Sequence, residues 1–366
     1  MRKLLIIPLA AAVLILSGIF IYQNRPKPAL ETKFAERAAE VPEEEVEVEN
    51  VVLVKPGDSA LLPNPRHTYQ TFNNCGPATL SMILSSLGTN VSQKELGDKM
   101  RPYQNPEGDN DDKTIFTSEF TLWAQKYGFK AVNRVGGDIE LLKLFTANGI
   151  PVVVKTWLNV DDDIGHFRIV RGFDETKKVI IQDDSYHGPN KQISYFDFLS
   201  MWQPFNYDYM VVYTPDMEEK VMAILGEERD EAVSWQNALE RAEKEKAIDP
   251  ENIYPVFNLA TSAYHTGDYE RSVAEFESVE AKLPRRMLWY QIEPILSYQK
   301  LGNYQRVFEI TDRILEGGNR AFSELYMVRG EIYKAQGDTA KAREAFELAV
   351  KYNQNLEAAK VALENL

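Results

Sequence analysis

A short turn motif that recurs every 35 residues constrains the second half of this 366-residue chain more than any other feature. The motif is Gly267-Asp268-Tyr269, and it returns as Gly302-Asn303-Tyr304 and as Gly337-Asp338-Thr339. Each copy separates two amphipathic segments of helical periodicity, and almost no strand pattern follows Met217. Self-similarity at this period is typical of helix pairs that stack on their neighbours. The sequence therefore predicts an all-helical array over residues 217–366.

The residues around these turns resemble tetratricopeptide repeats. In the third copy, small and aromatic residues occupy the positions where paired helices interlock, namely Gly330, Tyr333, Ala342, Phe346 and Ala349. In the first copy the fitting residues are Ala260, Phe276 and Pro284. The middle copy fits less well, because it has Ile295, Val307 and Thr311 at these positions. The resemblance implies about three and a half repeats that bind a protein partner; an unrelated helical bundle is the alternative.

The length and the pattern before Met217 predict another folded unit, since one hydrophobic core rarely serves more than about 250–300 residues. Helices are expected over residues 75–87, 92–100, 118–127 and 138–147, the second with a capping box made by Ser92 and Glu95. Strands are expected over residues 151–157, 166–173, 179–182 and 208–213. Helices followed by antiparallel strands predict an α+β domain over residues 51–216.

The first 28 residues predict a membrane anchor. Arg2 and Lys3 precede an uncharged run of nineteen residues from Leu4 to Tyr22. As a helix this run is about 28 Å long, close to the hydrocarbon thickness of a bilayer. A cleaved signal peptide is the alternative, although its apolar stretch is usually shorter. Because basic residues favour the cytoplasmic side, we expect a single-pass membrane protein whose catalytic and repeat domains lie outside the cytoplasm.

Charge and cysteine content exclude several classes of function. The formal net charge is −14, and a field of that sign repels phosphates, so we expect no nucleic-acid partner. Eight glutamates between Glu31 and Glu49 make residues 29–50 a self-repelling, extended linker. The only cysteine is Cys75, which rules out a disulfide within the chain and a cysteine-based zinc site. We expect no metal and no cofactor.

Cys75 has the sequence context of a reactive thiol. It opens a predicted helix and is followed by Gly76-Pro77. The dipole and N–H groups of a helix N-terminus favour an anion, and they lower the pKa of a thiol placed there. Pro77 suits the first helical turn, and Gly76 is expected to leave room for a substrate beside the sulfur. A buried structural cysteine is the alternative, but it would more commonly lie in mid-helix on the apolar face.

A thiolate nucleophile needs a base, and the base needs an orienting group. His166 begins a predicted strand and Asp183 ends the next one. Antiparallel pairing of the two strands can bring both residues near Cys75. Gln70, five residues before Cys75, supplies an amide that could stabilise an oxyanion.

The remaining histidines, His67, His187 and His265, are interpreted as surface residues. A metal site formed by His187 with the two adjacent aspartates is conceivable, but its spacing matches no standard pattern. The acidic loop at residues 161–163, just before His166, is interpreted as solvated; the alternative is a cleft rim that favours basic substrates.

The order of these residues resembles the bacteriocin-processing cysteine peptidases, which are papain-like enzymes first known for trimming double-glycine leader peptides in peptide exporters. The resemblance covers about Leu62 to Tyr213 and rests on three segments: Gln70 with Cys75-Gly76-Pro77-Ala78, Gly165-His166-Phe167 with Gly172-Phe173-Asp174, and an acid after an apolar strand. It implies Cys75 as nucleophile, His166 as base, Asp183 as orienting acid and Gln70 in the oxyanion hole.

The sequence departs from this family in two respects. The orienting acid of the family is usually followed by proline, whereas Asp184 follows Asp183 here, so either aspartate could orient the base; we favour Asp183. The sequence also contains no nucleotide-binding motif of an exporter, so the resemblance does not extend to leader-peptide substrates.

Two classes of function remain. The first is a membrane-anchored cysteine peptidase that cleaves an undefined peptide or protein. The second is a catalytically inactive binding or scaffold protein on the same fold; an acyltransferase that uses the same triad is a further alternative. We expect the enzyme, because nucleophile, base, acid and glutamine are all present. Since residues 51–216 hold this whole set, the repeats are expected to recruit a partner and to leave the chemistry alone.

Overall fold

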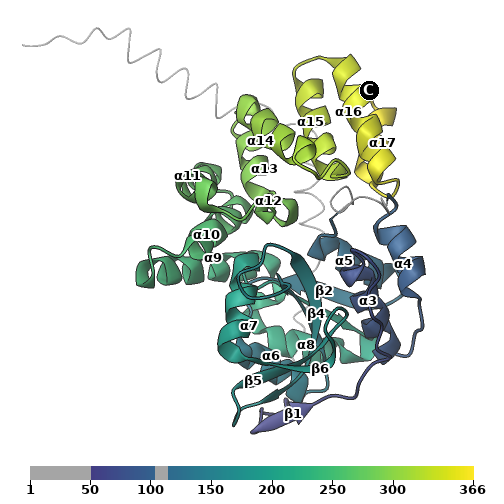
Figure 1. Ribbon diagram of the computed structural model, residues 1–366, viewed down its shortest axis with the longest axis vertical. Coiled ribbons are helices and arrows are strands. Elements are labelled where there is room, and N and C mark those ends of the chain that lie inside the picture. The colour runs from purple at the N-terminus through teal and green to yellow at the C-terminus, as the bar shows by residue number, and fades with distance from the viewer. Residues whose placement is uncertain (1–50, 104–113) are drawn as a thin grey trace, which may run out of the picture. The chain divides into compact units, whose positions relative to one another are not determined.

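An antiparallel sheet of seven strands forms the centre of the first domain in the computed structural model, which describes residues 51–103 and 114–366 (Figure 1). Six strands follow the order β2-β7-β3-β4-β5-β6, and β1 pairs with β4. The strands are β1 (Ser59–Leu61), β2 (Lys130–Arg134), β3 (Val152–Trp157), β4 (Gly165–Asp174), β5 (Val179–Asp184), β6 (Gly188–Ser194) and β7 (Tyr209–Tyr213).

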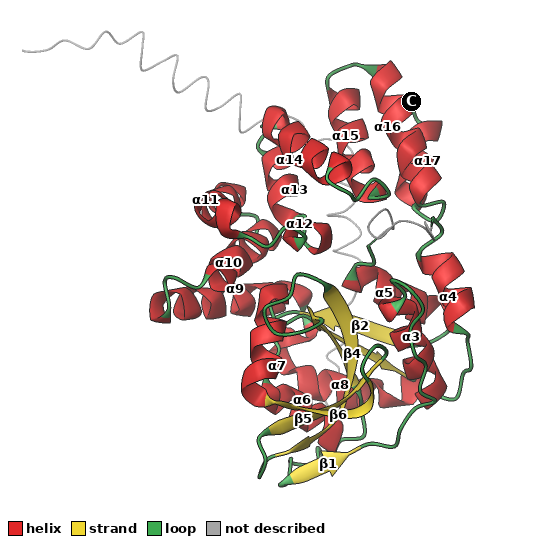
Figure 2. Ribbon diagram, in the orientation of Figure 1, coloured by secondary structure: helices red, strands yellow, loops and turns green. Residues whose placement is uncertain are grey.

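Helices cover both faces of this sheet (Figure 2). One face packs against α3 (Cys75–Ser86), α4 (Gln93–Met100) and α5 (Thr117–Lys126). The other packs against α6 (Ile139–Ala147), α7 (Tyr195–Trp202) and α8 (Glu218–Leu225). Strand β3 supplies both cores, because Val153 faces the first helical layer while Val152 and Val154 face the second. The predicted α+β class with an antiparallel sheet is confirmed.

All four predicted helices and all four predicted strands of this domain are present, with ends within a few residues of the prediction. Ser92 caps α4 as expected, and its hydroxyl accepts a hydrogen bond from the Glu95 N–H. Three strands and one helix, β1, β2, β6 and α7, are present without having been predicted from the sequence.

The second half of the chain consists of helices joined by the predicted turns. The helices are α9 (Glu231–Ile248), α10 (Ile253–His265), α11 (Tyr269–Val279), α12 (Met287–Tyr290), α13 (Glu293–Lys300), α14 (Tyr304–Glu316), α15 (Ser323–Ala335), α16 (Thr339–Tyr352) and α17 (Glu357–Glu364). The glycine of each motif has a positive φ, between +73° and +85°, a conformation that glycine adopts readily. The next residue of each motif, Asp268, Asn303 or Asp338, caps the following helix through its side chain.

The expected interlocking of paired helices is also present. A Cβ atom added to Gly330 of α15 would lie 2.4 Å from the Phe346 ring of α16, so only glycine allows this approach. The turns and this close contact together confirm the helical repeat region.

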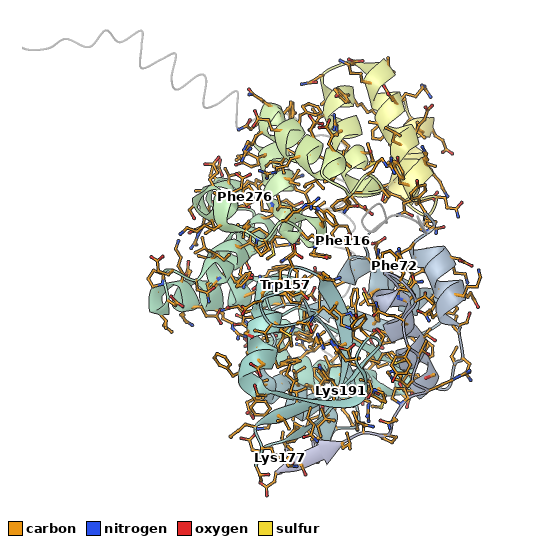
Figure 3. All side chains as sticks on the ribbon, in the orientation of Figure 1. Phe72, Phe116, Trp157, Lys177, Lys191 and Phe276 are labelled. Carbon is orange, nitrogen blue, oxygen red and sulfur yellow. The ribbon has the colours of Figure 1, made fainter. Side chains whose placement is uncertain are left out.

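The two parts of the chain share an apolar core. Trp157, Met201 and Phe205 of the first domain belong to the same buried cluster as the side chains of α10 to α15. Trp157 is labelled in Figure 3, where it lies close to the repeat helices. Polar contacts also join the two parts, including a hydrogen bond of 2.8 Å from Asn206 Nδ2 to Ser262 Oγ.

The predicted anchor (residues 1–28) and linker (residues 29–50) lie outside the described residues. Over residues 51–103 and 114–366, none of the helices combines the length and the apolar character needed to cross a bilayer.

Candidate active site

Cys75, the first residue of α3, opens onto a cleft of about 560 Å³. His166 at the start of β4 and Gln70 from the segment before α3 line the same cleft. Three of the four predicted site residues therefore surround one cavity.

The thiol of Cys75 is coupled to the imidazole of His166. Burial raises the pKa of the Cys75 thiol, but a hydrogen bond to His166 and the charge of that imidazole outweigh it. The net effect lowers the pKa of Cys75 to about 7. Burial likewise lowers the pKa of His166, but hydrogen bonds to Asp184 and to Cys75 raise it above its usual value. These shifts favour a thiolate beside an imidazolium near neutral pH.

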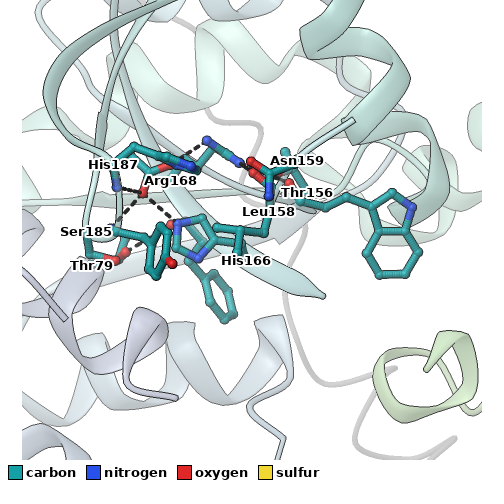
Figure 4. A network of polar contacts seen from close by, with 12 residues as sticks. Thr79, Thr156, Leu158, Asn159, His166, Arg168, Ser185 and His187 are labelled. Carbon is teal, nitrogen blue, oxygen red and sulfur yellow. Dashed lines mark hydrogen bonds and ion pairs between the residues drawn. The ribbon is translucent and has the colours of Figure 1, made fainter. Parts of the chain in front are cut away.

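The carboxylate that contacts His166 belongs to Asp184, so the preference for Asp183 was wrong. Nε2 of His166 lies 2.9 Å from Oδ1 of Asp184, and both side chains are buried. Asp184 also contacts the Arg168 guanidinium and Nδ1 of His187, and it accepts two backbone N–H groups of the β5–β6 loop (Figure 4). Burial raises the pKa of Asp184, but these donors, led by His166, hold it well below its usual range. Asp184 is therefore an ionised partner that fixes the imidazole.

Asp183 makes a separate buried ion pair. Its carboxylate contacts Nε and Nη2 of Arg171 at 2.7 and 3.0 Å, and both side chains are at most 2% exposed. It also accepts the backbone N–H of Asn190 at 2.9 Å. Asp183 therefore ties β4, β5 and β6 together and makes no contact with the imidazole of His166.

Strand register explains which aspartate reaches the histidine. Asp184 pairs with Arg168 across the β4–β5 ladder, whereas Asp183 pairs with Ile169. Side chains alternate between the two faces of a sheet, so His166, two residues before Arg168, shares the face of Asp184. A bulge between Val170 and Gly172 of β4 sets this register.

Gln70 is held in place by Ser185. Oε1 of Gln70 accepts a hydrogen bond from the Ser185 hydroxyl at 2.8 Å, and the Gln70 N–H donates to the Ser185 carbonyl. With its oxygen on Ser185, the side-chain nitrogen of Gln70 is the donor that can serve a developing oxyanion in the cleft.

Gly76 has a different role from the one expected. A Cβ atom on Gly76 would lie 2.9 Å from Cδ1 of Ile115 and 3.4 Å from the Phe167 ring. The side chains of Ile115 and Phe167 therefore occupy the space beside Gly76, which is not open to a substrate.

Lys155 is a site residue that the sequence analysis missed. It lies on β3, is 5% exposed and lines the cleft. Its Nζ lies 3.9 Å from the centroid of the Phe167 ring, and its charge contributes to the lowered pKa of Cys75. The available signal was a lone lysine inside the apolar run Val152–Trp157, since a buried cation is costly and commonly functional.

Three residues of the repeat region, Arg286, Trp289 and Tyr290, also line the cleft. The repeat region therefore borders the cleft, and the expectation that the repeats leave the chemistry alone stays a prediction. The acidic loop before His166 is not simply solvated, because Asp163 pairs with Arg286 at 2.5 Å.

The other histidines have varied surroundings. His187 is exposed, as expected of a surface residue, and its Nδ1 also lies 3.0 Å from Oδ2 of Asp184. His265 stacks on Trp235 with ring centroids 3.6 Å apart, and His67 lies edge-on to Tyr69. Within the described residues, no group of three or more histidine, cysteine or carboxylate side chains is arranged to hold a metal ion.

Comparison with known proteins identifies both parts of the chain. Residues 61–210 match the family described as Peptidase_C39 like, and residues 323–356 match the tetratricopeptide repeat. A search of curated proteins gives no match.

Several solved structures are similar to parts of the chain. A C39-like peptidase from Bacillus anthracis is 17% identical, covers 43% of this chain and 98% of its own, and has a TM-score of 0.36. The peptidase domain of Streptococcus ComA is 18% identical, covers 42% and 98%, and has a TM-score of 0.32. A thermophilic repeat protein of Thermus thermophilus is 18% identical, covers 38% and 77%, and has a TM-score of 0.31. The chain thus carries a Peptidase_C39-like domain followed by a tetratricopeptide-repeat region.

Proposed function

We propose that this protein is a cysteine peptidase in which Cys75 is the nucleophile, His166 the general acid and base, and Asp184 the orienting acid. The observation that carries this proposal is that Cys75 and His166 line one cleft, while Nε2 of His166 lies 2.9 Å from Oδ1 of the buried Asp184. An inactive scaffold would have no need for a buried histidine and aspartate that lower the pKa of an accessible thiol.

The geometry supports a two-step reaction. The Cys75 thiolate attacks the carbonyl carbon of a peptide bond, a C–S bond forms, and the carbonyl oxygen becomes an oxyanion. The Gln70 amide and the N–H groups at the start of α3 are placed to stabilise that charge. The His166 imidazolium then protonates the leaving nitrogen as the C–N bond breaks, which leaves a thioester on Cys75.

Water completes the reaction. Neutral His166 takes a proton from a water molecule, the resulting hydroxide attacks the thioester, and the carboxylic acid departs as the thiolate reforms. An amine that reached the thioester in place of water would give acyl transfer by the same residues.

Location and partners form a second part of the proposal. The uncharged run Leu4–Tyr22 supports a single-pass anchor, with the described domains outside the cytoplasm. The repeat region supports recognition of a protein partner, and a cavity of about 810 Å³ between α14, α15 and α16 offers a surface for it. Both aromatic and charged side chains line this cavity, among them Tyr333, Arg329 and Glu344.

The direct test is digestion of a mixed library of unfolded peptides, with new termini identified by mass spectrometry. We expect new termini with the wild-type protein and none above background with Cys75→Ala. Cys75→Ser is a matched control that keeps the volume of the side chain while replacing the thiol by a hydroxyl. The same set of termini from all three proteins would contradict the proposal.

A further inference from the structure

One wall of the catalytic cleft comes from α12 and the residue before it, far outside the segment that matches the peptidase family. Arg286, Trp289 and Tyr290 line the cleft together with Cys75 and His166. The match to the peptidase family ends at residue 210. These three side chains are therefore an addition to the peptidase domain that the repeat region brings.

Tyr290 lies directly against the backbone of Gly165, the residue before His166. A Cβ atom on Gly165 would lie 2.7 Å from Cε1 of Tyr290, so the ring occupies the space of a missing side chain. Burial raises the pKa of the Tyr290 hydroxyl, and the neighbouring backbone of Gly165 opposes this shift. Through these contacts the ring restrains the first residues of β4, where His166 begins.

The ring of Tyr290 is itself held by the peptidase domain. Its centroid lies 5.8 Å from that of Trp157 and 5.7 Å from that of Phe205. The Lys155 ammonium lies 5.2 Å from the same centroid. Tyr290 is thus packed between the strand that carries His166 and the lysine that supports the Cys75 thiolate.

A second contact ties the same segment to the cleft. Nη1 of Arg286 lies 2.5 Å from Oδ1 of Asp163, in the loop between β3 and β4. Two residues of that loop, Leu158 and Ile164, line the cleft, and the N–H of Leu158 donates to the Ile164 carbonyl at 2.7 Å. Residues 286–290 therefore contact the β3–β4 loop through Asp163 and the start of β4 through Gly165.

From these contacts we infer that α12 is part of the active site and that Tyr290 is a positioning residue for His166, an inference that rests on the proposed peptidase function. Tyr290 acts through the backbone of Gly165 and does not take part in proton transfer. A displacement of about 1 Å at a reacting group can lower a rate by about a hundredfold, so loss of this support should uncouple the imidazole from the thiol. The repeat array thereby sets the geometry of the catalytic pair as well as presenting a partner surface.

The test measures the pH dependence of Cys75 alkylation by iodoacetamide, together with peptide cleavage, in the full chain. The informative variants are Gly165→Ala, Tyr290→Ala, Tyr290→Phe and the double variant Gly165→Ala/Tyr290→Ala. The φ of Gly165 lies outside the left-handed region, and the three atoms nearest to an added Cβ all belong to the Tyr290 ring. Circular dichroism and thermal unfolding confirm that each variant is folded.

Two matched controls separate this effect from general destabilisation. Gly57→Ala adds the same methyl group where no atom lies within 4 Å. Tyr264→Ala removes a half-buried tyrosine of the repeats whose ring packs on Tyr269, with centroids 5.7 Å apart, away from the cleft. Both controls are expected to keep the wild-type alkylation profile.

We expect Gly165→Ala and Tyr290→Ala each to move the alkylation inflection towards that of a free thiol and to lower the rate of cleavage about 10- to 100-fold. Tyr290→Phe, which loses only the hydroxyl, should show a smaller shift in the same direction. In the double variant the added methyl group meets no ring, so its loss should equal that of Tyr290→Ala alone, within about threefold. Coupled residues give this non-additive result, whereas independent ones multiply their effects.

A wild-type profile in folded Tyr290→Ala, or multiplied losses in the double variant, would overturn the inference. If Tyr290→Ala does not fold, Gly165→Ala decides, because its methyl group displaces the same ring and a wild-type profile in that variant has the same meaning. The two proposals fail separately: a wild-type protein that cleaves peptides while the Tyr290 variants cleave equally well refutes only this inference. Profiles that shift as expected without any cleavage refute only the peptidase function.

Discussion

Nε2 of His166 lies 2.9 Å from Oδ1 of Asp184, and the adjacent Asp183 is bound instead by Arg171. Two neighbouring carboxylates of one strand thus have different tasks. Asp184 contacts the imidazole of His166, while Asp183 completes a buried ion pair between strands.

This division of roles predicts different effects for the two matched amide variants. Asp184→Asn should lower peptide cleavage at least about tenfold and reduce the pKa of His166, because the imidazolium loses its charged partner. Asp183→Asn should lower the free energy of unfolding, since it leaves the buried Arg171 charge uncompensated. Its alkylation profile should nevertheless match that of the wild type. Denaturant unfolding and iodoacetamide kinetics measure the two properties, and an unchanged profile in Asp184→Asn with a shifted one in Asp183→Asn would reverse the assignment.

The ammonium group of Lys155 should contribute to the reactivity of the thiol. Lys155→Met removes a cation that stabilises the Cys75 thiolate, so the pKa of Cys75 should rise from about 7. Lys155→Arg is the matched control, because it keeps the positive charge. We expect the midpoint of iodoacetamide labelling to move to higher pH in the methionine variant by more than in the arginine variant. Equal midpoints in wild type and Lys155→Met would show that the lysine has no such role.

Asp208 predicts a pH dependence of stability that is unrelated to the thiol. Burial raises the pKa of Asp208 to about 7, although hydrogen bonds to Thr117 and Asn133 oppose the shift. The folded state then keeps its proton between about pH 4 and pH 7 while the unfolded chain has lost it. The contribution to stability is therefore complete below about pH 4 and is lost as pH rises to about 7, by about 4 kcal/mol in total.

Asp208→Asn tests this prediction, because asparagine stays neutral at every pH. The variant should match the wild type near pH 4 and be the more stable protein at about pH 7.5 in thermal unfolding. If the difference in stability between the wild type and Asp208→Asn is the same at pH 4 and at pH 7.5, the pKa of Asp208 is not raised.

The repeats were predictable because their signal is local. The turn glycines and their capping residues recur at fixed spacing, and each turn has the conformation that its glycine implies. Strand β6 had no such signal, since GPNKQIS lacks an apolar alternation and is ordered by pairing with β5.

The choice between the two aspartates depended on a feature that the sequence does not reveal. In a regular ladder that started from the pair Asp174–Val179 and had no bulge, Asp183 would lie opposite Val170. Its side chain would then be on the same face of the sheet as His166. The bulge after Val170 shifts the ladder by one residue, and a one-residue shift moves every following side chain to the other face. The contribution of Tyr290 to the cleft was hidden for a similar reason, because it arises from packing between segments more than a hundred residues apart.

The rate of Cys75 alkylation by iodoacetamide as a function of pH, compared between wild type and His166→Ala, shows whether His166 activates the thiol. Because Cys75 is the only cysteine, every labelled thiol reports on the site. We expect an inflection near pH 7 for the wild type, since His166 lowers the pKa of Cys75 to about 7. In His166→Ala the inflection should rise to about 8.5 or above, the range of an unassisted thiol. Coincident profiles in the two proteins would contradict the claim that His166 activates Cys75.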